Sequence, residues 1–146
     1  MWHCALPTSY VAGVMTLVRA HFAGTTPIFT AHDLGDVAAG PGRNYLSLVP
    51  TQLRRALADA ATADRLARFD AVLVGGAALP GGLRERAAAS GVRVVATYGM
   101  SETCGGCVYD GVPLAGVSVT LEPGSGRVTI GGPVLFSGYR LDPDAS

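Results

Sequence analysis

Two apolar runs near the middle of the chain predict neighbouring strands of a parallel β-sheet. Residues 71–74 read Ala-Val-Leu-Val and end at Gly75 and Gly76, and residues 92–97 form a second, β-branched run. Strands that are buried on both faces of a parallel sheet are apolar without alternation. Residues 80–90 lie between the two runs and are expected to form a helix. The pattern therefore predicts a β-α-β unit with its loops at the carboxyl ends of both strands.

Helical spacing also marks the chain before this unit. Val11, Met15 and Val18 share one face of a predicted helix. Thr8 or Ser9 is expected to cap this helix at its start. The other elements expected in this part are short strands near residues 28–30 and 47–49, a helix that begins at Pro50 with Leu53, Ala56 and Leu57 on one face, and a second short helix lined by Leu66 and Phe69.

The last third of the chain alternates between apolar and polar residues. Val117, Val119 and Leu121 have polar neighbours, and Val128 and Ile130 repeat the pattern after a Pro-Gly-Ser-Gly turn. This alternation predicts an antiparallel β-hairpin. The fold class expected for the chain is therefore α/β, with a βαβ parallel-sheet unit and a C-terminal β-hairpin piece.

Composition narrows the possible functions. Charged residues make up 15% of the chain, hydrophobic residues make up 49%, and the formal net charge is zero. No basic cluster is longer than Arg54-Arg55, so binding to nucleic acid is not expected. All 11 basic residues are arginine, so no lysine of this chain can act as a general base, a Schiff base or a phosphate ligand.

The sequence also indicates where the protein works. It does not begin with the basic and apolar segments of a signal peptide, and none of its apolar runs approaches the ~20 residues of a membrane span. Its three cysteines are an odd number, and nothing suggests secretion. A reducing, cytoplasmic setting is therefore expected.

Four small residues, Gly75, Gly76, Ala77 and Ala78, follow the first predicted strand. Small side chains at this place allow a flat ligand to approach the backbone closely. The alternative is a tight strand-to-helix turn that binds nothing. The glycine spacing does not match a dinucleotide-binding fingerprint. Both interpretations stay open from these residues alone.

A hydroxyl and a carboxylate, those of Ser101 and Glu102, follow the second predicted strand. A hydroxyl can donate a hydrogen bond to a phosphate oxygen, and a carboxylate is a preferred ligand of magnesium. The alternative is a polar helix start with Ser101 as its cap. A hydrolase nucleophile turn is disfavoured, because Thr103 stands where that turn needs glycine and all three histidines precede the serine.

Cys104 and Cys107 form a CxxC motif, which in other proteins can be redox-active or can bind zinc. Two thiolates fill only half of a tetrahedral zinc site, and the sequence has no second CxxC motif to complete it. We therefore interpret the pair as unlinked cysteines in a glycine-rich loop, with no structural zinc.

Taken together, these motifs resemble the adenylate-forming acyl-CoA synthetase superfamily. Residues 72–80, followed about twenty residues later by residues 98–103, are similar to its nucleotide-binding segments. Residues 47–53, 98–103 and 107–111 are most similar to the o-succinylbenzoate–CoA ligases of menaquinone biosynthesis. The resemblance covers essentially the whole chain. Further similar segments are Leu6-Pro7, Ala12-Gly13, residues 111–117, residues 126–128, Gly132-Pro133 and Gly138-Tyr139.

The resemblance implies a reaction in two steps. ATP and a carboxylate give an acyl-adenylate and diphosphate, and coenzyme A then displaces AMP to form a thioester. Tyr98 would stack on the adenine, Ser101 would bond the α-phosphate and Glu102 would bind Mg²⁺. The implied nucleotide site comprises Gly75, Gly76, Ala77, Ala78, Tyr98, Gly99, Met100, Ser101 and Glu102, and the implied acyl pocket comprises Tyr10, Thr51, Gly99 and Gly105.

By the same resemblance, residues 1–146 correspond to a fragment of the N-terminal adenylation domain. The phosphate loop of these enzymes would lie upstream and the C-terminal lid domain, with the adenylation lysine, would lie downstream, so we assign no catalytic residue to this chain. Tyr10 stands where the family commonly has histidine. Expected partners are ATP, coenzyme A and a small carboxylate, and the complete protein can form a homo-oligomer. The alternative is a self-standing α/β nucleotide-binding module without catalysis.

Overall fold

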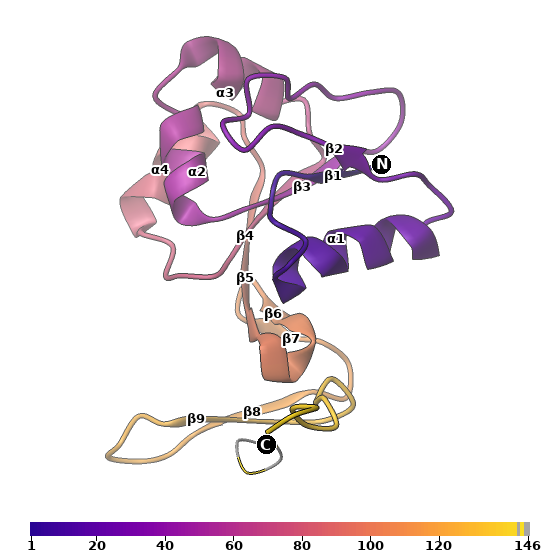
Figure 1. The fold of residues 1–146 in the computed structure, drawn as a ribbon. Helices are drawn as coiled ribbons and strands as arrows, with labels where there is room; N and C mark the ends of the chain where they lie inside the picture. The colour runs from indigo at the N-terminus through magenta and orange to yellow at the C-terminus, as the bar shows by residue number, and fades with distance from the viewer. Residues whose placement is uncertain (143, 145–146) are drawn as a thin grey trace.

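One mixed β-sheet organises the computed structural model, which describes residues 1–142 and 144 (Figure 1). In the order in which they lie side by side, the strands of this sheet are β2 (Ile28–Phe29), β1 (Trp2–Cys4), β3 (Tyr45–Leu48), β4 (Ala71–Val74), β5 (Val94–Met100), β6 (Gly105–Tyr109) and β7 (Val112–Pro113). The first five run parallel to one another. Strands β6 and β7 extend the sheet in antiparallel fashion.

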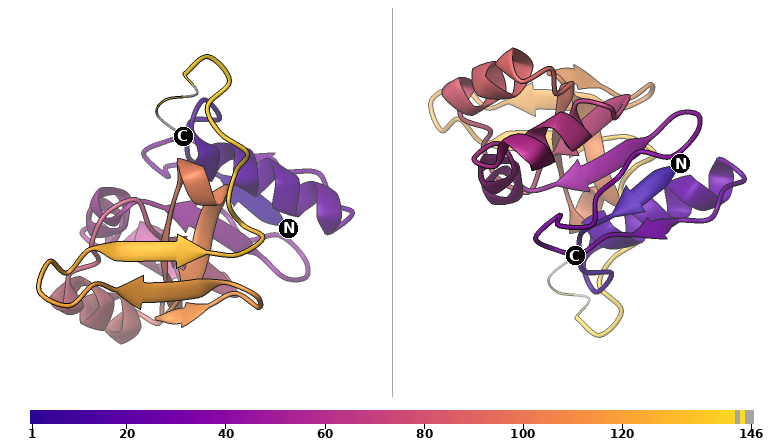
Figure 2. Two further views of the ribbon diagram at one scale, coloured as in Figure 1. Left: turned by 90° about the horizontal axis from the view of Figure 1, so that it is seen from below. Right: turned by 90° about the horizontal axis from the view of Figure 1, so that it is seen from above.

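Helices cover both faces of this sheet (Figures 1 and 2). Helix α1 (Val11–Phe22) lies on one face, and α2 (Pro50–Ala56), α3 (Ala60–Leu66) and α4 (Gly81–Ala89) lie on the other. The main hydrophobic core fills the space between the sheet and α2, α3 and α4. Phe69, which the sequence placed on a helix, lies beyond the end of α3 and is fully buried in this core. Cover on both faces explains why the parallel strands are apolar without alternation.

The predicted β-α-β unit is confirmed by β4, α4 and β5. Strands β4 and β5 pair in parallel from Val72 with Val94 to Val74 with Ala96. Helix α4 ends shortly before Gly91, whose φ of 72° suits glycine and closes the helix. The predicted α/β fold class is confirmed with it.

Strand β5 differs from the prediction at both ends, and it changes partner along its length. Its first half pairs in parallel with β4, and residues 97–100 pair antiparallel with β6. The register shifts between Tyr98 and Gly99. The predicted span of 92–97 starts too early, because the N–H of Val92 still donates to the carbonyl oxygen of Ala87 in α4. It stops too early because β6 supplies partners for three more residues.

Two predictions about helix starts are wrong. Tyr10 occupies the cap position of α1 and makes no side-chain cap hydrogen bond, so neither Thr8 nor Ser9 caps this helix. Ser101 begins only a single 3₁₀ turn, η1 (Ser101–Thr103), and β6 follows that turn directly. The interpretation of Ser101 as the cap of a longer helix is therefore excluded.

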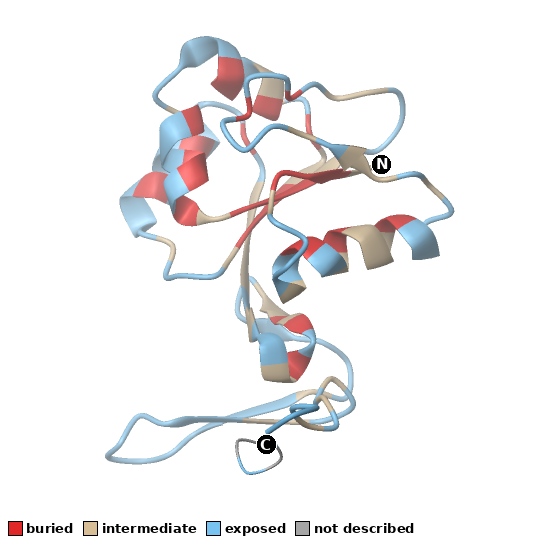
Figure 3. Ribbon diagram, viewed as in Figure 1, coloured by how far each residue is buried: buried red, intermediate tan, exposed pale blue. Residues whose placement is uncertain are grey.

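The predicted C-terminal hairpin is confirmed by β8 (Ser118–Leu121) and β9 (Val128–Gly131), which pair antiparallel. It forms a sheet of its own, and most of its residues are exposed (Figure 3). After β9 the chain returns to η1, where the backbone N–H of Phe136 donates to the carbonyl oxygen of Glu102 at 2.9 Å. The segment after the hairpin therefore lies beside η1, next to the end of β5.

Candidate functional site

Two cavities lie next to each other at the carboxyl ends of β4 and β5. Gly76, Thr97 and Gly99 line both of them. In a parallel sheet this edge collects the loops of successive strands, and adjacent strands lie only about 5 Å apart. Residues that follow two different strands therefore meet here. We name the two cavities the Tyr98 cavity and the Arg19 cavity, each after one lining residue.

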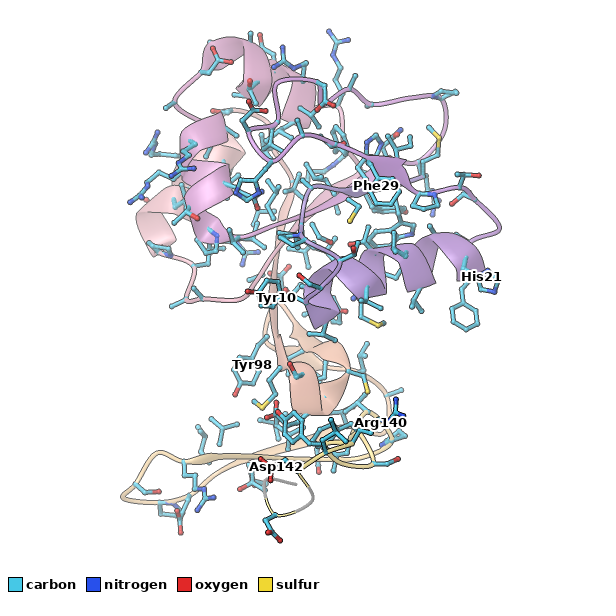
Figure 4. The ribbon with its side chains drawn as sticks, viewed as in Figure 1. Tyr10, His21, Phe29, Tyr98, Arg140 and Asp142 are labelled. Carbon is cyan, nitrogen blue, oxygen red and sulfur yellow. The ribbon has the colours of Figure 1, made fainter. Side chains whose placement is uncertain are left out.

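The Tyr98 cavity has a volume of about 480 Å³ and is mainly apolar. Gly76, Ala77 and Ala78 line it from the loop after β4. Tyr98, which is labelled in Figure 4, lines it from β5. The Tyr98 side chain is 43% exposed, which leaves its ring accessible to a ligand. A flat aromatic ligand can lie here between a backbone of small residues and an aromatic face.

The Arg19 cavity has a volume of about 380 Å³ and contains the charged groups of the site. Its two charged lining residues are Arg19, from α1, and Glu102, from η1. The polar residue Ser47 of β3 also lines it. The other residues of the predicted site that line it are Gly75, Gly76, Gly99, Met100, Ser101 and Gly105.

Two glycines at this edge of the sheet have no room for a side chain. A Cβ atom on Gly99 would lie 2.0 Å from the carbonyl oxygen of Gly105, and a Cβ atom on Gly75 would lie 2.3 Å from the hydroxyl oxygen of Thr97. The contact at Gly99 would force the backbone of β5 or β6 to shift, and the contact at Gly75 would displace the Thr97 side chain. Glycine is therefore required here for the packing of β5 against its neighbours, whether or not a ligand binds.

A residue far along the chain holds the carboxylate of Glu102. The Tyr139 hydroxyl donates to Oε1 of Glu102 at 2.6 Å. This hydrogen bond lowers the pKa of Glu102 below its ordinary value, and the same contact raises the pKa of Tyr139. Glu102 is therefore an ionised carboxylate at neutral pH.

Hydrogen bonds of Thr103 stabilise the turn that carries Ser101 and Glu102. Its side chain is buried, and its hydroxyl donates to the carbonyl oxygen of Gly105 at 2.7 Å and accepts from the N–H of Met100 at 2.9 Å. These two bonds tie the end of β5 to the start of β6. Thr103 thus has a structural role at the place where a hydrolase turn would have glycine.

Arg19 is a candidate that the sequence analysis missed. Its Nη2 donates to the Tyr109 hydroxyl at 2.8 Å, and its Cζ lies 5.3 Å from the centre of the Trp2 ring. In the part of the chain that the structure describes, no carboxylate lies within ion-pair distance of it. A signal was available, because Val11, Met15 and Arg19 follow one another at intervals of four and line one cavity from one helix face.

Ser47 is a second candidate that the sequence analysis did not single out. Its side chain is 7% exposed, and its Oγ has no hydrogen-bond partner among the described residues. A buried hydroxyl without a partner costs about 1–3 kcal/mol of folding free energy. A polar atom of a ligand in the Arg19 cavity would remove this cost.

Two residues of the predicted acyl pocket lie outside the linings of both cavities, as far as the structure describes them. Tyr10 stands at the start of α1 with 69% of its side chain exposed (Figure 4), and Thr51 is exposed on α2. Gly99 and Gly105, the other two, do line the Arg19 cavity. The roles assigned to Tyr10 and Thr51 therefore stay predictions.

The sequence suggested that the CxxC motif lies in a loop, but the structure places all of it except Cys104 in strand β6. Cys107 is fully buried in β6, and Cys104 is exposed just before it, with a φ of 51°. Across residues 1–142 and 144, no group of three or more His, Cys, Asp or Glu side chains could hold a metal ion. Within the same residues, no helix combines the length and the apolar content that crossing a membrane requires.

Comparison with known proteins agrees with this geometry. The profile of the AMP-binding enzyme family matches residues 1–141. A Mycobacterium tuberculosis protein named probable 2-succinylbenzoate–CoA ligase is 47% identical over 154 residues. That match covers 98% of this chain and 40% of the relative, so the chain spans less than half the length of this relative.

Solved structures share the fold. Escherichia coli MenE with a bound m-phenylether-linked analogue of OSB-AMS is 28% identical with a TM-score of 0.73, over 94% of this chain and 31% of that chain. The o-succinylbenzoate coenzyme A synthetase (MenE) of Bacillus subtilis in complex with ATP and magnesium ion has a TM-score of 0.75 at 21% identity, over 99% and 36% of the two chains. With a profile match over nearly its whole length and a site at the expected edge of the sheet, the chain belongs to the family of AMP-binding enzymes.

Proposed function

We propose that this chain is the nucleotide- and acid-binding part of an ATP-dependent acyl-CoA ligase that acts on o-succinylbenzoate. The complete enzyme would convert o-succinylbenzoate, ATP and CoA into o-succinylbenzoyl-CoA, AMP and diphosphate through an acyl-adenylate. The observation that carries the proposal is the pair of adjoining cavities, one apolar with an aromatic wall and the other with two opposite charges. The 2-succinylbenzoate–CoA ligase name of the Mycobacterium tuberculosis relative supports the choice of acid.

The adenine of ATP would bind in the Tyr98 cavity. There the small residues from Gly76 to Ala78 leave their backbone accessible, and the exposed ring of Tyr98 supplies a face for stacking. A stacked aromatic pair contributes about 0.5–1.5 kcal/mol beyond the burial of its area. Because Gly76, Thr97 and Gly99 line both cavities, the phosphate end of the nucleotide would then point towards the Arg19 cavity.

The acid would bind in the Arg19 cavity. o-Succinylbenzoate has two carboxylates, and only one of them can react with the α-phosphate in a given turnover. Arg19 has no carboxylate partner and Ser47 Oγ has no hydrogen-bond partner among the described residues. A guanidinium binds a carboxylate through parallel hydrogen bonds that are stronger than those between neutral groups. We therefore assign Arg19 and Ser47 to the carboxylate that does not react.

Glu102 fits a magnesium ion that is shared with the phosphates of the nucleotide. Magnesium is commonly held by one or two carboxylates together with phosphate oxygens, rather than by a complete protein cage. Glu102 supplies an ionised carboxylate on the cavity wall, and the described residues form no cage. When bound, the ion would neutralise negative charge on the phosphate oxygens.

Ser101 would act on the α-phosphate directly, through its hydroxyl. Negative charge grows on the equatorial oxygens of phosphorus as the carboxylate attacks. A hydrogen-bond donor fixed beside those oxygens therefore stabilises the transition state more than the ground state. The two hydrogen bonds of Thr103 support this role, because they join the turn that carries Ser101 to the end of β5 and the start of β6.

The complete protein would add the parts that this chain does not supply. We expect a phosphate loop upstream and a C-terminal lid domain with the adenylation lysine downstream, since the match covers 40% of the Mycobacterium tuberculosis relative. The described cysteines, Cys4, Cys104 and Cys107, are free thiols, which supports a reducing, cytoplasmic setting. The complete protein can also form a homo-oligomer, and light scattering on the protein of the whole reading frame would measure this.

The test is diphosphate release by the protein encoded by the whole reading frame around this chain. With ATP and Mg²⁺, we expect release that depends on o-succinylbenzoate, and thioester formation when coenzyme A is added. A preference for acids with a single carboxylate would contradict the choice of substrate. ATP binding without diphosphate release, for any acid offered, would favour the nucleotide-binding module instead.

A further inference from the structure

Residues from two strands of the main sheet hold the guanidinium of Arg19, which extends from helix α1. The Tyr109 hydroxyl, from β6, accepts from Arg19 Nη2 at 2.8 Å, and the Trp2 ring, from β1, lies 5.3 Å from Arg19 Cζ. Trp2 is itself stacked on Tyr45, with ring centroids 4.8 Å apart and an interplanar angle of 29°. A guanidinium is attracted to the face of an aromatic ring. The charge of Arg19 is therefore held from two sides, with neutral partners.

The hydroxyl of Tyr109 has a fixed direction. It donates its single proton to the carbonyl oxygen of Gly106 at 3.1 Å, which leaves its lone pairs for Arg19. A guanidinium has five N–H donors, and this contact uses one of them. Arginine also has a long side chain that loses much rotamer freedom when it binds an anion. A side chain that is ordered beforehand loses less, so it binds the anion more tightly.

We propose that Tyr109 is a positioning residue that gives the ligase its preference for acids with a second carboxylate. It acts by holding Arg19 in the orientation that this carboxylate needs. The inference rests on the proposed function, in which Arg19 binds the carboxylate that does not react. Because that carboxylate stays unchanged during the reaction, its contact with Arg19 is equally strong in the ground state and the transition state. Loss of the contact should therefore raise KM and leave kcat nearly unchanged.

The test is Tyr109→Phe, which removes the hydroxyl and keeps the ring. In the protein of the whole reading frame, we expect KM for o-succinylbenzoate to rise about 10-fold, with kcat within about twofold of wild type. KM for 4-oxo-4-phenylbutanoate, which is the same acid without its ring carboxylate, should not change. The matched control is Tyr45→Phe, which removes a hydroxyl from the ring that stacks on Trp2 and should leave both KM values as they are.

Two outcomes would overturn the inference: an equal rise in KM for both acids, and an unchanged KM for o-succinylbenzoate. A wild-type protein that releases no diphosphate with either acid would contradict the proposed function instead. A second measurement then decides the role of Tyr109 without activity. In protein labelled with ¹⁵N-arginine, Tyr109→Phe should speed the exchange of the Arg19 Nη protons with water about tenfold, and unchanged exchange would contradict the positioning role.

Discussion

Among single residues, Glu102 gives the sharpest test of the proposed site, because structural and metal-binding roles predict opposite results. Its carboxylate lines the Arg19 cavity and accepts a hydrogen bond from Tyr139. Glutamine keeps an acceptor oxygen for Tyr139 but loses the charge that a magnesium ion needs. In the protein of the whole reading frame, Glu102→Gln should melt within about 2 °C of wild type. Its rate of acyl-adenylate formation, measured as diphosphate release, should fall at least ~100-fold.

A matched control for this variant is Glu85→Gln, which makes the same chemical change on an exposed position of α4, away from both cavities. It should change neither the melting temperature nor the rate. If Glu102→Gln melted at a clearly lower temperature and kept a near-normal rate, Glu102 would have a structural role, and the assignment of the magnesium site would be wrong even within this family.

His3 makes the free energy of unfolding depend on pH. Its side chain is 1% exposed, its Nε2 lies 3.1 Å from Oδ1 of Asn44, and its ring packs edge-on against Phe69. Burial lowers the pKa of His3 below 6.5, against the opposing effect of the Asn44 hydrogen bond. The unfolded chain therefore takes up a proton near pH 6.5 that the folded chain does not. The free energy of unfolding should fall as the pH drops below about 6.5.

Urea unfolding at a series of pH values checks this prediction. His3→Gln should flatten the dependence below pH 6.5, whereas His21→Gln, at an exposed position of α1, should keep it. Equal slopes for wild type and His3→Gln in that range would show that other groups cause the dependence.

At the scale of elements, the sequence predicted those that keep one pattern along their length. The apolar run of β4 predicts a buried parallel strand, and the alternation of β8 and β9 predicts an antiparallel hairpin. The structure confirms both. Strand β5 has one parallel and one antiparallel partner, so no single period describes it. The sequence did not predict strand β6, because the two glycines of the CxxC motif have no side chains and so break the alternation of apolar and polar residues.

The residues of the candidate site also fall into two groups, those that the sequence could indicate and those that it could not. Gly76, Ser101 and Glu102 could be found because each follows a strand closely in the sequence, and loops after parallel strands meet at one edge. Arg19 and Tyr109 could not be paired, because they are 90 positions apart and lie on a helix and a strand that no local pattern relates. The contact between Arg19 and Tyr109 depends on the packing of α1 against β6.

The close approach of β5 to β6 predicts a large effect of one added methyl group. Gly99→Ala would place Cβ 2.0 Å from the Gly105 carbonyl oxygen, so the two strands would have to separate. We expect the free energy of unfolding to fall by about 1–3 kcal/mol, measured by urea unfolding. Gly82→Ala is the control, because its Cβ would meet no atom within 4 Å. In helix α4 this change should raise stability by about 0.5–1 kcal/mol. Equal effects of both variants would contradict the tight contact.

For the molecule as a whole, the absence of lysine limits what the 146-residue chain can do alone. By its resemblance to adenylate-forming enzymes, the reaction needs a lysine beside the attacking carboxylate and the α-phosphate, and this sequence contains none. The chain by itself should therefore release no diphosphate above the rate without protein, when o-succinylbenzoate, ATP and Mg²⁺ are supplied. The protein of the whole reading frame is the positive control. Release by the isolated chain would show that lysine is dispensable.

The change of partner along β5 also has a consequence for how the protein folds. Its antiparallel half pairs residues as near in the sequence as Met100 and Gly105, whereas the parallel half of the sheet joins residues as distant as Trp2 and Tyr45. Hairpins close within microseconds, but distant pairing first has to overcome the entropy of closing long loops. Both cavities lie at β5, between its parallel pairing with β4 and its antiparallel pairing with β6. We therefore expect a nucleotide to bind only after the slow pairing of the parallel strands, and then to stabilise the finished fold by mass action.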